Sequence, residues 1–271
     1  MKLIKIITLL FIFISSSAFG KEEYYRQYEH FRDIVYLQNV TIPEMREFYL
    51  KTVKIVKSTT LNEKKKYTLL AQIESLMGTY FQLATAENYK VMVDVTQFNP
   101  KKGYNALKYT KEATYHFTRS VKLSNRAMKK GEFSAALAIR SNSAGQLCIL
   151  KGLFYTLTHG LGVLGDSSKA RKLDKSNVKA MVLYASTKAY PPPIYFGNPK
   201  YAIKILNNIL KMKNIEKDDY FNIYLALGLS YAKQKKNVQS LYWLKRALKI
   251  YPTNKIAGEL QRQVKLNIYK R

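Results

Sequence analysis

Few residues in this chain combine a type and a spacing that could do chemistry, and its histidines match no metal site. The 271 residues include three histidines, His30, His116 and His159. None of them stands three or four positions from another histidine, as zinc ligands on one helix do. His116 lies between Tyr115 and Phe117, two aromatic residues that favour a packing face of a helix. We therefore expect no metal site and interpret His116 as a packing residue.

A single cysteine and a glycine-rich stretch are the other candidates for chemistry. A lone cysteine cannot form a disulfide within its own chain, and we interpret Cys148 as a small buried apolar residue. The stretch GLGVLG at 160–165 spells the G-x-G-x-x-G of dinucleotide-binding loops. It follows a predicted helix instead of a strand, and no acidic residue stands about 20 positions further on. We interpret it as a turn between helices.

Motifs of the common enzyme classes do not appear in the sequence. It spells no nucleophile elbow, no phosphate-binding loop and no paired acidic motif. We therefore predict no catalytic residue and no cofactor-binding residue. The chain is expected to bind a partner and not to act as an enzyme.

The chain is strongly basic. Lysine and arginine number 46 against 18 aspartates and glutamates, which gives a formal net charge of +28. Such an excess favours an anionic partner, either an acidic protein or peptide or an anionic envelope surface. Compositional drift is an equally good explanation of the excess. Nucleic acid is the usual partner of a basic intracellular chain, but the export signal described next argues against it.

The first 20 residues have the layout of an export signal. A basic start precedes an apolar run over residues 6–14, and Ala-Phe-Gly at 18–20 supplies the small-x-small exit that signal peptidase reads. The run is too short to cross a bilayer as a helix, which takes about 20 residues. An uncleaved anchor or a buried first helix is the alternative. We expect a cleaved signal peptide, a periplasmic or secreted product, and no transmembrane segment in the mature chain.

Hydrophobic residues recur at helical spacing along most of the chain. Thr60, followed three residues later by Glu63, predicts a capping box at the start of a helix. A long helix is predicted over residues 133–157, ended by the glycines of 159–166. The β-branched residues at 89–98 fit a short strand or an irregular connection, and we favour the connection.

The clearest pattern lies in residues 221–254. Small side chains at Gly228, Ser240 and Ala247 allow two antiparallel helices to approach closely, and Pro252 ends the second helix. The pattern resembles the tetratricopeptide repeat (TPR), a helical hairpin of about 34 residues. The large residues that carry the resemblance are Tyr224, Leu227, Tyr231 and Leu244.

Weaker copies of this pattern precede it. Residues 198–212 resemble the second helix of a preceding unit, whose first helix falls at about 177–190. Further upstream, the resemblance matches Gly78 to a first helix and Phe117 to a second one, across an insertion at 84–103.

The sequence therefore predicts an all-α fold, a right-handed α-solenoid of degenerate TPR-like helical hairpins with an irregular N-terminal helical cap. Its expected parts are the signal peptide at 1–20, the cap at 21–58, degenerate hairpins at 59–176 and TPR-like repeats at 177–271.

The resemblance also implies a function. Stacked hairpins present a concave surface lined by their first helices, which implies a non-catalytic scaffold that binds a protein or peptide. In the best repeat, the groove-facing residues implied by the resemblance are Asn222, Leu225, Leu229, Ala232 and Lys233. For the three apolar residues, packing on a neighbouring repeat is an equally good interpretation.

An insertion between two predicted helices suggests an alternative function. Tyr195 and Phe196 follow three prolines there, and they either cover a helix pair or reach the groove and touch a ligand. An insertion of this kind before the second helix of a repeat also resembles the one found in periplasmic TPR-like proteins associated with tripartite ATP-independent (TRAP) transporters. That resemblance implies a solute-binding partner or a small apolar ligand.

Overall fold

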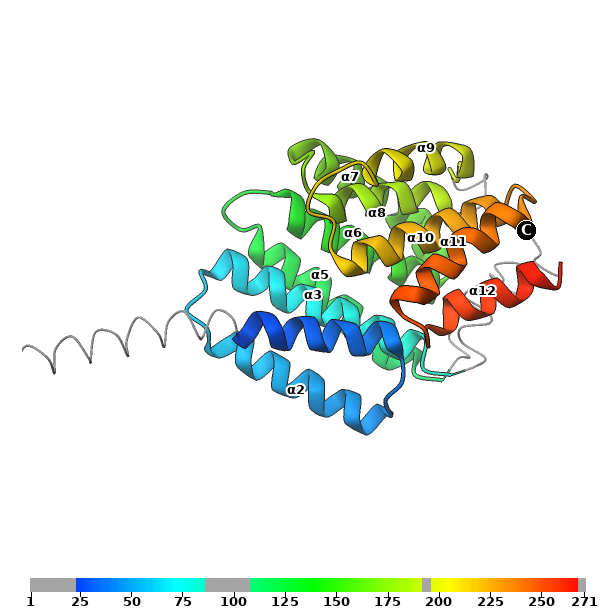
Figure 1. Ribbon diagram of the computed structural model, residues 1–271. Coiled ribbons are helices and arrows are strands. Elements are labelled where there is room, and N and C mark those ends of the chain that lie inside the picture. Colours follow the sequence, from blue (N-terminus) through cyan, green and yellow to red (C-terminus); the bar gives the residue numbers. More distant parts are fainter. Residues whose placement is uncertain (1–22, 86–107, 192–195, 268–271) are drawn as a thin grey trace, which may run out of the picture.

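Figure 1 shows the computed structural model of the chain, which describes residues 23–85, 108–191 and 196–267. All regular secondary structure in these ranges is helical, so the predicted all-α class is confirmed. The predicted signal peptide at 1–20 and the stretch at 89–98 lie outside the described residues. The first described helix covers residues 23–37, and it is followed by α2 (Ile42–Ser58), α3 (Glu63–Gln82), α5 (Thr110–Ala127), α6 (Ser134–Lys151), α7 (Leu153–Leu173), α8 (Val178–Ala189), α9 (Pro199–Ile209), α10 (Lys217–Ala232), α11 (Asn237–Ile250) and α12 (Lys255–Lys265).

The helices pack as consecutive hairpins: α3 with α5, α6 with α7, α8 with α9, and α10 with α11. Neighbouring hairpins contact one another through α5 and α6, through α7 and α8, and through α8 and α10. This stacking is the arrangement expected of a helical-hairpin array. The pair α8 and α9 confirms the helices predicted on either side of the insertion.

The hairpin of α10 and α11 confirms the close contact predicted for residues 221–254. A Cβ atom built on Gly228 would stand 2.6 Å from Cδ2 of Leu244. Across the same interface, the Ser240 hydroxyl donates a hydrogen bond to the Gly228 carbonyl at 2.8 Å, and Ala247 is fully buried. Small residues therefore set the distance between these helices, as the TPR pattern predicts.

The hairpin of α3 and α5 repeats this arrangement. A Cβ atom on Gly78 would stand 2.9 Å from the ring of Phe117, which is itself fully buried. The Ser120 hydroxyl donates to the Ala71 carbonyl at 2.7 Å across the same interface. The upstream unit predicted from Gly78 and Phe117 is therefore confirmed.

The capping box predicted at Thr60 and Glu63 does not form. The N-cap of α3 is Asn62, whose side-chain oxygen accepts a hydrogen bond from the backbone N–H three residues on, at 2.9 Å. Asparagine is as good an N-cap as threonine or better, so the helix starts at the later position. A capping box does form at the start of α2, between Thr41 and Glu44.

The single helix predicted over residues 133–157 is wrong, because the chain breaks at Gly152. This glycine takes φ +83° and ψ −165°, a conformation that other residues rarely adopt, and it separates α6 from α7. The glycines of 160–165 lie inside α7, so the turn predicted there is also wrong. As a result, Phe154 and Leu157 do not continue the apolar face of α6, and both are exposed.

The first described helix links the two ends of the chain. Phe31 belongs to the core formed with α2 and α3. The ring of Tyr36 stacks on Tyr251 at a centroid distance of 4.9 Å and meets Phe221 edge-on at 5.2 Å. The helix at 23–37 therefore packs against the C-terminal hairpins, a contact that the sequence pattern does not predict.

Candidate functional site

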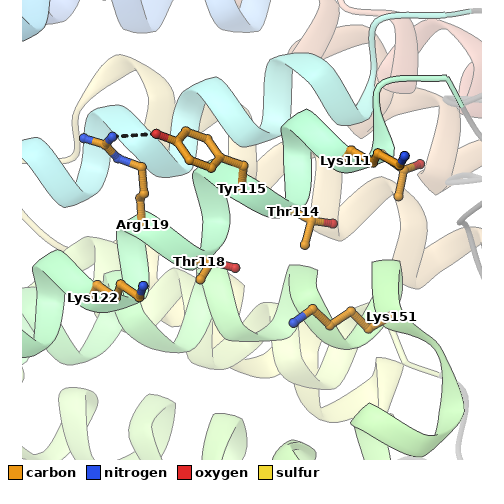
Figure 2. Close-up of a pocket in the computed structure, with 8 residues that line it drawn as sticks. Lys111, Thr114, Tyr115, Thr118, Arg119, Lys122 and Lys151 are labelled. Atoms are coloured by element: carbon orange, nitrogen blue, oxygen red, sulfur yellow. Dashed lines mark hydrogen bonds between the residues drawn. The ribbon is translucent and has the colours of Figure 1, made fainter.

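A basic groove lies along the exposed side of α5 (Figure 2). Its volume is about 500 Å³, and α5 supplies the whole lining except Lys151 of α6. Thr110, Thr114 and Thr118 recur every four residues, so they line up along one side of the helix. The lining residues are Thr110, Lys111, Thr114, Tyr115, Thr118, Arg119, Lys122 and Lys151.

The chemistry of this groove suits an anion. Four of its eight lining residues are cations and none is a carboxylate; of the four, Arg119 is paired with a carboxylate behind the lining, Glu74. The other four residues carry hydroxyl groups, which donate hydrogen bonds. Charged donors of this kind form short, strong hydrogen bonds with carboxylates and phosphates.

A buried carboxylate positions Arg119 at the wall of the groove. Glu74 of α3 is 2% exposed and lies 2.9 Å from Nε of Arg119, 2.6 Å from Nδ1 of His116 and 2.8 Å from the Tyr49 hydroxyl. The hydrogen bond from Arg119 to the Tyr115 hydroxyl, at 2.7 Å, raises the pKa of the arginine. Arg119 is thus held in its charged form. His116 is buried in this network, in agreement with its predicted packing role.

A second basic hollow lies beyond the groove, near the C-terminal end of α5. It has a volume of about 740 Å³ and lies where the start of α3 meets the turn between α5 and α6. Nζ of Lys64 lies 4.0 Å from the ring centroid of Phe133, and the guanidinium of Arg126 lies 5.8 Å from that of Tyr67. Arg126 follows Lys122 by one helical turn, so the cations that α5 contributes to the groove and to the second hollow form one row along this helix.

Residues 23–85, 108–191 and 196–267 contain no cluster of three side chains able to hold a metal ion. No helix in them combines the length and apolar character that a membrane crossing requires. Cys148 is buried, as predicted, and burial raises the pKa of its thiol.

The residues predicted to line a groove in the C-terminal repeat are covered by other parts of the chain. Nδ2 of Asn222 donates a hydrogen bond to the Tyr36 hydroxyl at 2.9 Å. Leu225 and Leu229 are buried in the core of the C-terminal hairpins. Their role in binding a partner stays a prediction, and at Asn222 a partner would compete with the Tyr36 hydroxyl for the side-chain amide.

The two aromatic residues predicted in the insertion are only partly placed. Phe196 is 60% exposed and takes φ +65°. Tyr195 lies outside the described residues. The insertion is closed at its base by a hydrogen bond from the Asn198 backbone N–H to the Lys188 carbonyl, at 2.8 Å. A ligand contact at Phe196 stays a prediction.

A cluster of ion pairs explains why the helix at 23–37 covers this region. Arg32 is 3% exposed and lies 3.0 Å from Asp218 and 3.3 Å from Glu216. Lys179 of α8 lies 2.9 Å from the same Glu216 carboxylate. Burial raises the pKa of the adjacent Asp219 to about 6. Because carboxylates from α10 surround it, the buried arginine keeps its charge.

Lys233 closes the C-terminal end of α8. Its Nζ donates to the carbonyls of Ala189 at 2.7 Å, of Pro191 at 3.2 Å, and of Tyr190. Burial lowers its pKa to about 8. Carbonyls at a helix end have no partner within the helix, and a cation there also complements the helix dipole. The structure therefore gives Lys233 an internal role, and its predicted contact with a partner stays a prediction.

Replacing this lysine tests its internal role. Lys233→Met is expected to lower the free energy of unfolding by about 1.5 kcal/mol, because the end of α8 loses its donor. Urea unfolding followed by circular dichroism at neutral pH measures this. Lys245→Met, on the exposed side of α11, is the matched control, with an expected change within about 0.5 kcal/mol. Equal losses in the two variants would contradict the capping role.

The α5 groove was not among the predicted sites, although part of its signal is present in the sequence. At about 100° per residue, Lys111, Tyr115 and Lys122 fall on the side of the helix opposite Ala113 and Phe117. Charged and polar residues opposite an apolar face indicate an exposed stripe. The contribution of α6 has no such signal, because it depends on how the helices pack.

No protein-family model matches the sequence, and no curated protein matches it. Among solved structures, the chain is similar to one described as "Crystal structure of YrrB: a TPR protein with an unusual peptide-binding site". The identity is 15%, the match covers 79% of this chain and 91% of that chain, and the TM-score is 0.37.

Proposed function

We propose that this chain is an exported, non-catalytic scaffold that binds an acidic protein or peptide along α5. The observation that carries the proposal is the lining of the α5 groove, which contains four cations and no carboxylate. The layout of residues 1–20 supports export, and an exported chain would meet its partner in the periplasm or outside the cell.

The length of the basic row favours an extended partner. With 18 residues, α5 is about 27 Å long at 1.5 Å per residue. A peptide of about eight extended residues spans that length at about 3.3 Å per residue. Its carboxylates would meet the cations that recur along α5, from Lys111 near one end to Arg126 near the other.

A model acidic peptide tests the groove. The probe is fluorescein-labelled decaglutamate, and binding is measured by fluorescence anisotropy at low and high salt. The double variant Lys111→Glu/Lys122→Glu is expected to bind at least about tenfold more weakly, since it replaces two attractions with two repulsions. Binding to the wild-type chain should weaken with salt.

A charge-matched control separates the groove from the net charge. Lys245→Glu/Lys249→Glu makes the same change in net charge at exposed positions of α11 and should keep wild-type affinity. Equal weakening by the two double variants would refute the groove. A pull-down from an envelope extract with the wild-type and groove-variant chains then identifies the natural partner. Mass spectrometry of the exported chain reports whether residues 1–20 are removed.

The transporter-associated alternative receives no comparable support from the described residues. It depends on Tyr195 and Phe196, of which only Phe196 is described, and that side chain is 60% exposed. The α5 groove, by contrast, has a defined lining and a consistent charge.

A further inference from the structure

The first half of α7 carries an exposed apolar ridge, formed by Phe154, Leu157 and Leu161. These side chains are 83%, 66% and 72% exposed. Their spacing of three and four residues places them on one side of the helix. Residues 152–165 contain no lysine, arginine, aspartate or glutamate. Large apolar side chains gathered on one exposed face indicate an interaction surface.

The threonine hydroxyls beside the ridge have hydrogen-bond partners in α7 or in the residues just before it. The Thr156 hydroxyl donates to the Gly152 carbonyl at 2.9 Å, and the Thr158 hydroxyl donates to the Tyr155 carbonyl at 3.0 Å. The ring of His159 stacks on Tyr155 at 3.9 Å, and its Nδ1 lies 2.7 Å from Oγ1 of Thr158. A protein interface usually carries about one hydrogen bond per 100–200 Å², whereas contact with lipid favours polar groups that are already paired.

A cation, Lys151, borders the ridge on the side of the α5 groove. It is the last residue of α6, and its Nζ lies 4.6 Å from the ring centroid of Tyr155 of α7. The same lysine lines the groove together with Lys111 and Lys122. A second copy of the chain on this ridge would bring two basic faces together. An anionic surface instead complements both the border and the net charge of +28.

We propose that the α7 ridge docks the chain on an anionic lipid bilayer. Phe154, Leu157 and Leu161 enter the boundary between headgroups and acyl chains, and Lys151 lies among the anionic headgroups. Apolar burial and electrostatic attraction then act together, as they do for helices that lie in the plane of a bilayer surface. The acidic-partner proposal rests on the α5 groove, so the two proposals can fail separately.

Sedimentation with vesicles tests the docking. The full exported chain is mixed with vesicles of phosphatidylcholine alone and of phosphatidylcholine with phosphatidylglycerol. We expect binding to the anionic vesicles and binding at least about tenfold weaker to the neutral ones. Leu157→Asp/Leu161→Asp should lose at least about tenfold in partitioning to the anionic vesicles, because it removes apolar burial and adds repulsion.

The control places the same change at exposed apolar residues elsewhere. Leu50 of α2 and Val238 of α11 are 64% and 81% exposed, and Leu50→Asp/Val238→Asp should bind like the wild-type chain. Circular dichroism checks that both variants are folded. The proposal is overturned if the wild-type chain stays in the supernatant, if the ridge variant binds as the wild type does, or if neutral vesicles bind as well as anionic ones. If the wild-type chain forms a dimer that only the ridge variant fails to form, the ridge binds a second copy of the chain, and the membrane-docking proposal is also overturned. If the ridge variant no longer sediments with the vesicles but keeps wild-type affinity for decaglutamate, the ridge and the groove are separate sites.

Discussion

Gly228→Val is expected to lower the free energy of unfolding by about 3 kcal/mol. A Cβ atom at this position would stand 2.6 Å from both Cγ and Cδ2 of Leu244, which is fully buried. The valine therefore has to push α10 and α11 apart or force the leucine out of its rotamer. Urea unfolding followed by circular dichroism measures the loss.

Two comparisons isolate the steric cause. Gly165→Ala, at a position of α7 where an added Cβ meets no atom within 4 Å, should raise the free energy of unfolding by about 0.5–1 kcal/mol through helix propensity. In a Leu244→Ala background, Gly228→Val should destabilise by at least about 1 kcal/mol less than in the wild-type chain, because the truncated side chain leaves room. A full loss in that background would contradict the contact between Gly228 and Leu244.

Close helix contacts were predictable because they are local in the repeat pattern. Gly228 and Leu244 lie within one unit of about 34 residues. The repeat pattern pairs a small residue on the first helix with a large one on the second, so it predicts that these two residues are in contact. The same match predicted Gly78 against Phe117, despite the insertion between their helices. In both hairpins a serine hydroxyl on the second helix donates to a backbone carbonyl on the first, at 2.8 and 2.7 Å.

The glycines in and between α6 and α7 show that the position of a turn could not be predicted from the sequence. A glycine permits a turn but does not require one. Those at 160–165 tolerate a continued helix, and α7 packs over Gly145 of α6 with a methyl group of Val163 placed 3.5 Å from an added Cβ. Gly152, in contrast, is an isolated glycine, yet its positive φ reverses the chain between α6 and α7. Packing between the two helices therefore decides at which glycine the chain turns.

The candidate sites depend on contacts that no local pattern encodes. Asn222 was expected in a groove, but its partner is Tyr36, 186 residues earlier in the chain. The basic groove combines a stripe on α5 with Lys151 from α6. The composition indicated an anionic partner, while only the folded arrangement indicates the surface that would meet it.

Arg32→Met is expected to lower the free energy of unfolding by about 3–5 kcal/mol. The side chain is buried 3.0 Å from Asp218, which is itself 5% exposed. Removing one partner of a buried ion pair leaves the other charge desolvated and only partly compensated. Here Lys179 remains as the nearby cation, 3.2 Å from the same carboxylate, so the loss should not exceed this range. Hydrogen exchange should report faster exchange in residues 23–37 than in the wild-type chain.

An exposed ion pair supplies the control for this substitution. Lys169 of α7 pairs with Glu132, and the two side chains are 52% and 42% exposed. Lys169→Met should therefore change the free energy of unfolding by less than about 1 kcal/mol. A similarly small loss for Arg32→Met would show that the ion pair does not hold the helix at 23–37 in place. The aromatic stack of Tyr36 on Tyr251 would then be the main contact covering Asn222, and the binding groove predicted there would open only when that stack separates.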